Sequence, residues 1–174
     1  QTILQELFKS DGFKNSVDLP KVKSPTELVV GVLKQVGTYS EMRPGLEKII
    51  DVVSVMGQEL LNPPTVEGWH TGSEWIDSGT LSERINFASH EFLDIENPCV
   101  RDMVQRVGSL DDNPDELVGR CLDVLGGIEV SSATHSELLE YATSLIKQEK
   151  TERGSADISD LIQMIVSTVD YQYA

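Results

Sequence analysis

The sequence is poor in aromatic residues, in cysteine and in positive charge, and it contains no long hydrophobic run. Aromatic residues make up 6% of the 174 residues, whereas hydrophobic residues as a whole make up 39%, so the expected core is aliphatic. No apolar run approaches the roughly 20 residues that a membrane-spanning helix needs, which argues against a transmembrane segment. The only cysteines are Cys99 and Cys121, each in or just before an apolar helical stripe. We therefore expect two buried free thiols rather than a disulfide.

Negative charge dominates the composition. The chain has 14 basic and 29 acidic residues, which gives a formal net charge of −15. An acidic surface repels the phosphate backbone of nucleic acids and the anionic surface of membranes, so neither is an expected partner. The same composition also fits a chain whose acidic residues simply form a well-solvated surface.

Hydrophobic spacing predicts helices almost throughout the chain, because apolar residues recur every three or four positions in eight segments. These segments are Ile3 to Phe8, Leu28 to Val36, Leu46 to Leu60, Leu81 to Phe92, Val100 to Val107, Leu117 to Leu125, Leu138 to Ile146 and Ile158 to Tyr173. No segment alternates convincingly with the period of a strand. We predict an all-α bundle of about seven to eight short helices, in one domain over residues 1–174 with a possible subdivision into 1–93 and 94–174.

One long loop, at residues 62–78, interrupts these helices. Pro63 and Pro64 end the preceding helical pattern and stiffen the loop, which carries both tryptophans of the chain, Trp69 and Trp75. Large aromatic side chains in a loop are held against something. Two interpretations remain open. The indole rings plug the end of the bundle, as the burial supplied by large aromatics favours, or they line a ligand site.

If the loop is a site, its candidate ligand-binding residues are Trp69, His70, Trp75 and Asp77. The aromatic rings could stack on a sugar or on a side chain of a protein partner. The carboxylate of Asp77 could then hydrogen-bond the same group. Glu67 lies at the spacing from His70 that a di-iron carboxylate motif uses, but the local glycine and prolines prevent the helix that this motif needs.

Other residues near the loop are expected to act structurally. Gly68, like the two prolines, shapes the backbone of the loop. The hydroxyl of Ser78 can cap the helix that follows. Arg84 is expected to pair with a carboxylate of the loop, a contact worth about 1 kcal/mol or less if exposed.

The other motifs do not predict a metal or cofactor site. Asp111, Asn113 and Asp115 are spaced like the first ligands of a calcium loop, but the required glycine and glutamate are missing at the sixth and twelfth positions. Asn113 is better explained as the N-cap of a helix. His90 and Asp94 have the spacing of a zinc motif in which the second residue should be histidine. Signatures of a serine nucleophile, a phosphate loop and a dinucleotide fold are absent from the sequence.

The chain resembles a bacterial family, the domain-of-unknown-function family 1800, in particular its C-terminal part. The matching residues are Met56-Gly57-Gln58, Pro63-Pro64, Gly68-Trp69, Trp75-Ile76, Ser78, Thr80-Leu81, Arg84 and Asn86-Phe87, with Leu7-Phe8, Ser10, Phe13-Lys14, Val22 to Pro25 and Glu27 to Gly31 upstream and Ile165 to Tyr173 at the end. Two positions depart from the family pattern, His70 where many members have proline and Asp77 where many have asparagine. A ligand-binding role for His70 therefore gains no support from the resemblance.

The resemblance implies a chain that is part of a longer protein, and an exported one, in the periplasm or outside the cell. It implies no chemistry, cofactor or substrate. We expect an uncharacterised helical module that is non-catalytic in itself and serves assembly or partner binding, with a protein, a glycan or the rest of its own longer chain as the partner. The alternative is the C-terminal part of a hydrolase-like enzyme whose main catalytic residues lie upstream.

Overall fold

The computed structural model describes residues 2–15, 21–37, 39, 41, 44–109, 113–147 and 155–173. Over these ranges the chain forms nine α-helices and two short 3-10 helices, and it forms no strand beyond isolated bridges. The α-helices are α1 (Thr2–Lys9), α2 (Asp11–Asn15), α3 (Pro25–Val36), α4 (Leu46–Val55), α5 (Ser78–Leu93), α6 (Pro98–Val107), α7 (Pro114–Val124), α8 (Ser132–Lys147) and α9 (Ser155–Val166). The 3-10 helices are η2 (Gly72–Trp75) and η3 (Asp170–Gln172). The predicted all-α class is confirmed.

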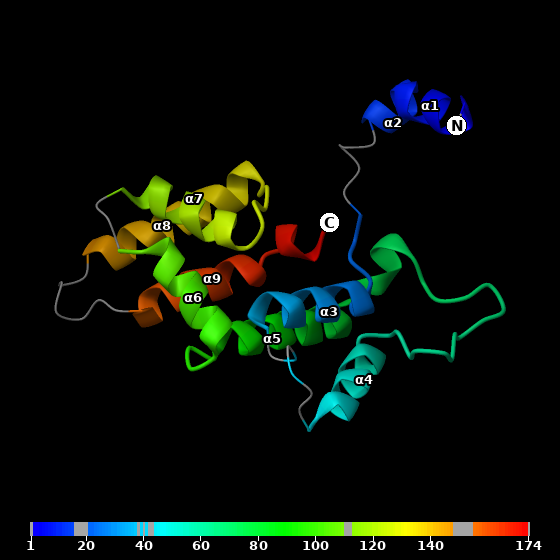
Figure 1. Cartoon of the computed structure of the whole chain (residues 1–174), viewed down its shortest axis with the longest axis horizontal. Helices are drawn as coiled ribbons and strands as arrows, with labels where there is room; N and C mark the ends of the chain where they lie inside the picture. Colours follow the sequence, from blue (N-terminus) through cyan, green and yellow to red (C-terminus); the bar gives the residue numbers. More distant parts are fainter. Residues whose placement is uncertain are drawn as a thin grey trace.

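Helix α9 lies at the centre of the helical body, where it packs against α5, α6, α7 and α8 (Figure 1). Its apolar stripe is buried, as the periodicity of the sequence predicts, and this stripe includes Leu161, Ile162, Ile165 and Val166. Helix α3 packs on α5, and α4 packs on both α3 and α5. The core is therefore mainly aliphatic, with Phe92 as its largest fully buried aromatic side chain.

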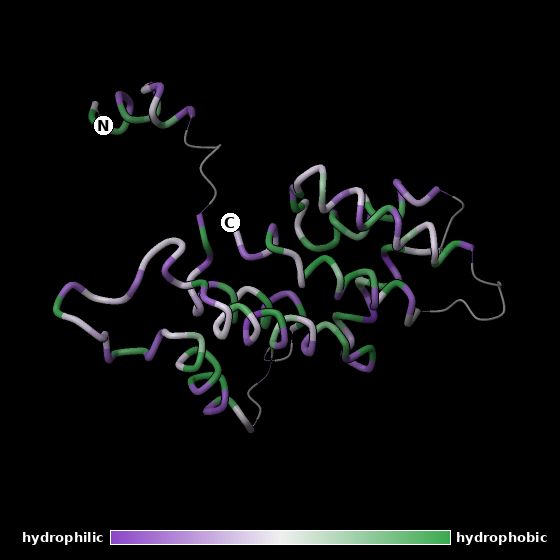
Figure 2. Tube along the Cα trace, turned by 180° about the vertical axis from the view of Figure 1, so that it is seen from behind, coloured by the Kyte–Doolittle hydropathy of each residue, from purple (hydrophilic) through white to green (hydrophobic). Residues whose placement is uncertain are grey.

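Two helices at the edge of the molecule carry much of the remaining hydrophobic surface. Figure 2 shows hydrophobic residues along α1 and α4, which lie at opposite edges of the view. None of the described residues of α1 or α2 is buried. On α4, Val53 is the one buried residue.

Local signals fix the start and end of α3 as expected. Ser24 accepts a hydrogen bond from the backbone N–H of Glu27, and the Glu27 side chain accepts one from the backbone N–H of Ser24, which is a complete capping box. Hydrogen bonds from Lys21 and from the Ser24 backbone lower the pKa of Glu27 to about 2. Gly37 ends the helix with φ of 65°, and a Cβ at that position would lie 2.5 Å from Cys99 Sγ. Gly37 is thus required both by its backbone conformation and by this close contact.

Helix α4 is shorter than its apolar spacing predicts. The stripe extends to Leu60, but the helix ends at Val55, and Gly57 and Leu61 have φ of 96° and 66°. A Cβ on Gly57 would meet nothing within 4 Å. Gly57 therefore forms the turn that ends the helix, in a backbone conformation that favours glycine.

The two cysteines are both free but differ in environment. Cys121 is buried on α7 as predicted, and burial raises the pKa of its thiol to about 12. Cys99 is exposed in the first turn of α6, so the prediction that it is buried is wrong. The buried stripe of α6 begins one residue later, at Val100.

Candidate functional site

The loop between α4 and α5 borders a pocket of about 520 Å³, which we call the loop pocket. It is lined by residues from the end of α4, from the loop and from the first turn of α5: Ser54, Met56, Gly57, Glu59, Asn62, Pro63, Pro64, His70, Glu74, Trp75, Asp77 and Thr80. Three of the four candidate ligand-binding residues, His70, Trp75 and Asp77, therefore line one cavity. The fourth, Trp69, is not part of this lining.

The two tryptophans of the loop have different environments. Trp75 is only 5% exposed at the end of η2, and its ring is perpendicular to the His70 ring, with the ring centroids 6.0 Å apart. Trp69 is half-buried, and its Nε1 donates a hydrogen bond to the backbone oxygen of Glu59 at 2.9 Å. Trp75 thus fills the base of the loop, while Trp69 fastens the loop back onto the segment that leaves α4.

The polar side chains that line the loop pocket include His70, Glu74 and Asp77. His70 Nδ1 lies 3.7 Å from Glu74 Oε2, and both side chains are exposed. Asp77 accepts hydrogen bonds from the backbone N–H groups of Thr80 and Gly79, which lower the pKa of its carboxyl. Asp77 is therefore an ionised helix cap that can accept hydrogen bonds or attract a cation, and it is poorly suited to donate a proton.

The position of Asp77 also shows that the predicted start of α5 is wrong. Asp77 is the N-cap, and Ser78 is the first residue of the helix, so the capping role given to Ser78 is wrong by one position. Asp77 accepts from Thr80 N through its side chain, and Thr80 Oγ1 accepts from Asp77 N at 2.9 Å. An aspartate is as good an N-cap as a serine, so the sequence alone left both registers possible.

The remaining loop residues with an expected structural role lie where the loop turns. Gly68 has φ of 110°, which favours glycine, and its N–H donates to the backbone oxygen of Thr65 at 3.1 Å. Pro63 and Pro64 line the loop pocket on the side that follows α4. The prolines restrict the backbone there and give this wall of the pocket a defined shape.

Arg84 does not pair with a loop carboxylate, so that prediction is wrong. Its side chain is fully buried, with Nε donating to Gln172 Oε1 at 2.9 Å and Nη2 donating to the backbone oxygen of Lys23. Lys23 Nζ in turn donates to the Tyr171 backbone oxygen at 2.7 Å and lies 4.4 Å from the centre of the Tyr171 ring. We call Lys23, Arg84, Tyr171 and Gln172 the terminal clamp, because they join the start of α3, the middle of α5 and the C-terminal segment.

The terminal clamp concentrates positive charge in a strongly acidic chain. Burial, and then the nearby Arg84 guanidinium, lower the pKa of Lys23. Arg84 Nη1 and Gln172 Nε2 are buried without a hydrogen-bond partner in the described part of the chain. Burying a guanidinium costs free energy, because it loses its hydration and is held here by neutral acceptors. Loss of its hydrogen bonds to Gln172 and Lys23 would leave this buried charge uncompensated, so these bonds favour the observed geometry.

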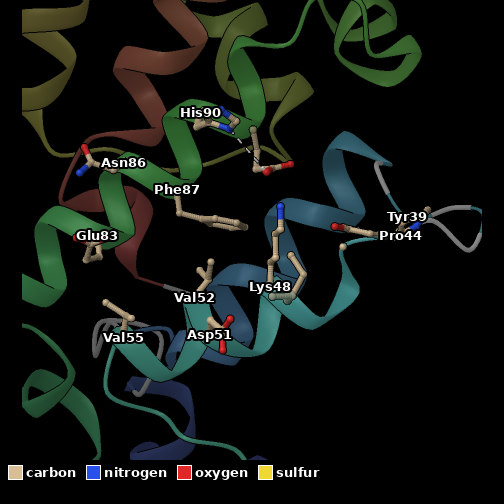
Figure 3. A pocket seen from close by; sticks show the side chains of 13 residues that line it. Tyr39, Pro44, Lys48, Asp51, Val52, Val55, Glu83, Asn86, Phe87 and His90 are labelled. Atoms are coloured by element: carbon tan, nitrogen blue, oxygen red, sulfur yellow. Dashed lines mark ion pairs between the residues drawn. The ribbon is translucent and has the colours of Figure 1, made fainter.

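A second cavity, which sequence reasoning missed, lies between α4 and α5 (Figure 3). This α4–α5 groove has a volume of about 630 Å³ and is lined by Tyr39, Pro44, Gly45, Lys48, Ile49, Asp51, Val52, Val55, Glu83, Asn86, Phe87, His90 and Glu91. Phe87 projects from α5 toward α4, and Val52 faces it across the groove (Figure 3). Three aliphatic residues of α4, Leu46, Ile50 and Val55, are exposed, and Val55 is one of the lining residues.

The residues that the structure describes contain neither a group of metal ligands nor a candidate membrane-spanning helix. No group of three or more histidine, cysteine, aspartate or glutamate side chains there is placed to hold a metal ion. None of the described helices has both the length and the apolar composition to cross a bilayer. Asn113 caps α7 as expected, with its side chain accepting from Asp115 N and Glu116 N, while Asp111 lies outside the described residues.

Comparison with known proteins identifies a family but no closer relative. Neither the curated proteins nor the solved structures gave a match. A family model described as Protein of unknown function (DUF1800) matches residues 1–173, which is essentially the whole chain. The resemblance carried by the loop motif is thereby confirmed, and the chain belongs to the DUF1800 family of proteins of unknown function.

Proposed function

We propose that residues 1–174 form a single helical domain, non-catalytic in itself, that binds an amphipathic helix of a protein partner in the α4–α5 groove. The observation that carries this proposal is the groove itself, which has a volume of about 630 Å³ and includes the exposed Val55 of α4 in its lining. Grooves of this kind between two helices accept the apolar face of a third helix.

The floor and the rim of the groove suit such a ligand. Ile49, Val52 and Phe87 are partly buried and pack against the core, so they give the groove an apolar floor. Lys48, Asp51 and Glu83 surround this floor with charge. An apolar centre with a polar rim is the usual arrangement of a protein-binding surface, because the centre supplies affinity and the rim supplies orientation.

A designed neutral peptide of leucine and glutamine, with leucines at helical spacing, tests this groove without relying on charge. We expect Val55→Asp to weaken the binding of this peptide about tenfold, because a carboxylate next to the apolar face must be desolvated. Val55 is 62% exposed, so the substitution leaves the core intact. Fluorescence anisotropy of the labelled peptide gives the dissociation constant.

The matched control is Val30→Asp, which makes the same change on α3. Val30 is 44% exposed and does not line the groove. Binding that is equally weakened by both substitutions, or by neither, would exclude the groove as the binding surface. Circular dichroism of the three proteins confirms that their helix content is the same.

The loop pocket supports a second candidate function, the binding of a small polar ligand such as a glycan. The observation that favours it is the convergence of His70, Trp75 and Asp77 on one cavity, which the exposed His70–Glu74 pair also lines. An aromatic wall with polar groups at its edge is typical of a small-molecule site. This function also suits the alternative in which the chain is the C-terminal part of an enzyme.

Tryptophan fluorescence titrated with a panel of soluble oligosaccharides tests the loop pocket. If a sugar binds there, we expect a saturable change in emission that is lost in His70→Ala, because the imidazole packs against the Trp75 ring at the cavity. Glu129→Ala, a change on the exposed segment between α7 and α8, is the control and should keep the response. A flat titration with every sugar in the panel excludes glycan binding.

A further inference from the structure

The loop pocket differs in charge from the other cavities that the structure describes. Its lining includes the three carboxylates of Glu59, Glu74 and Asp77, and the described residues that line it include no lysine or arginine. Each of the other described cavities has a lysine or an arginine in its lining. The electrostatic field of the loop pocket therefore favours a positively charged ligand and disfavours an anionic one.

The three carboxylates keep an oxygen atom available for a ligand. The hydrogen bonds that they accept within the described part of the chain go to one oxygen of each group, from backbone N–H groups for Asp77 and Glu74 and from Asn62 Nδ2 for Glu59. A carboxylate can accept about four hydrogen bonds through its two oxygens. The second oxygen of each group can therefore accept a hydrogen bond from an ammonium group.

Trp75 adds a hydrogen-bond donor that the protein itself does not use. Its side chain is only 5% exposed and lines the pocket, yet no described residue accepts a hydrogen bond from its indole Nε1. The indole of Trp69, in contrast, donates to the backbone oxygen of Glu59 at 2.9 Å. A buried indole N–H group usually has an acceptor. A hydroxyl oxygen of a ligand in the pocket can supply that acceptor to Trp75.

The rest of the lining suits a sugar ring. Met56, Pro63 and Pro64 add apolar surface to that of Trp75, and the lining also includes neutral hydroxyl and amide side chains. The volume of about 520 Å³ lies within the range of roughly 300 to 1,000 Å³ that is usual for small-molecule sites. The fitting ligand has an apolar face, several hydroxyl groups and a positive charge.

We propose that the loop pocket binds an amino sugar, a saccharide whose amino group is protonated and carries no acetyl group. This proposal rests on the second function proposed above, glycan binding in the loop pocket, and names the class of glycan. The ammonium group pairs with the available carboxylate oxygens, and hydroxyl groups pair with the indole N–H of Trp75 and the neutral side chains. A neutral glycan would desolvate these carboxylates without compensating their charge, and a linear polyamine has no oxygen for the indole.

Isothermal titration calorimetry of the 174-residue chain with two trisaccharides tests the requirement for charge. The trimer of glucosamine and the trimer of N-acetylglucosamine have the same rings and differ only at nitrogen. We expect the glucosamine trimer to bind about tenfold tighter or more, and we expect added salt to reduce this difference because it screens the ion pairs.

Variants of the carboxylates show where the charged trimer binds, because a cationic saccharide is attracted to the whole acidic chain. Glu74→Gln and Asp77→Asn remove one charge each but keep a side-chain oxygen for capping, and we expect each to weaken binding about fivefold. Glu129→Gln makes the same kind of change on an exposed residue outside the pocket lining and should leave binding unchanged. Equal effects of all three substitutions would overturn the proposal.

The other outcomes separate this proposal from glycan binding in general. If both trimers bind equally well, the loop pocket is a glycan site that does not recognise charge, and only the amino-sugar proposal fails. If neither trimer nor any other saccharide binds, both proposals fail. Spermidine that competes with the glucosamine trimer at equal affinity would show that any amine suffices, and would exclude the sugar as the specific ligand.

Discussion

Replacing Arg84 with alanine is expected to lower the free energy of unfolding by about 3 kcal/mol or more, because it opens a cavity and leaves buried acceptors without a donor. The acceptors are Gln172 Oε1 and the backbone oxygen of Lys23, which both bond the fully buried guanidinium. Urea denaturation followed by circular dichroism measures the change. Arg84→Met is expected to cost less than Arg84→Ala, because methionine refills most of the volume and removes the buried charge.

Arg101→Ala provides the control for the loss of an arginine. Its guanidinium is half-exposed and lies 3.1 Å from Glu96 Oε2, and a surface pair of this kind contributes about 1 kcal/mol or less. Equal effects of the two alanine substitutions would show that Arg84 is not part of a buried clamp.

Replacing Trp75 with alanine is expected to cost about 3 kcal/mol, since a large buried aromatic side chain is lost from the base of the loop. Trp69→Ala is expected to cost about 1 kcal/mol, because Trp69 is half-buried and loses one hydrogen bond to the Glu59 backbone oxygen. Thermal and urea unfolding of the two variants measure this difference.

The comparison of the two tryptophans decides between the two interpretations of the loop. A large cost for Trp75 means that this residue plugs the bundle, whatever else the loop pocket binds. If Trp75→Ala leaves stability unchanged while oligosaccharide binding is lost, the ring serves a ligand and not the fold. Trp75→Phe, which keeps an aromatic ring at the site, should recover part of the stability.

Much of the helical architecture follows from local sequence signals. The stripe of α9 and the capping of α3 and α7 depend on residues within one or two turns, so periodicity and capping rules predict them well. The end of α4 was less predictable. Apolar residues continue in register to Leu60, but the positive φ values of Gly57 and Leu61 show that packing of the loop overrides this pattern.

The cavities and the terminal clamp could not be read from sequence for a different reason. Each depends on segments that are distant in the chain, as when Arg84 meets Gln172, 88 positions away. One signal was nevertheless present, because Arg84 is placed one turn from Leu81 and Ala88, within the apolar stripe of α5. Three of the four candidate loop residues, His70, Trp75 and Asp77, line one cavity, as residues that are close in sequence and constrained by prolines can do. Their role in binding a ligand stays a prediction.

The terminal clamp also bears on how the chain acquires its structure during synthesis. Lys23 and Arg84 leave the ribosome long before Gln172, yet their backbone and side-chain partners include Tyr171 and Gln172. Until Tyr171 and Gln172 have been synthesised, the guanidinium has to stay hydrated, and α3 and α5 cannot close fully around it. The final docking of α3 and α5 around Arg84 therefore has to follow the synthesis of Gln172.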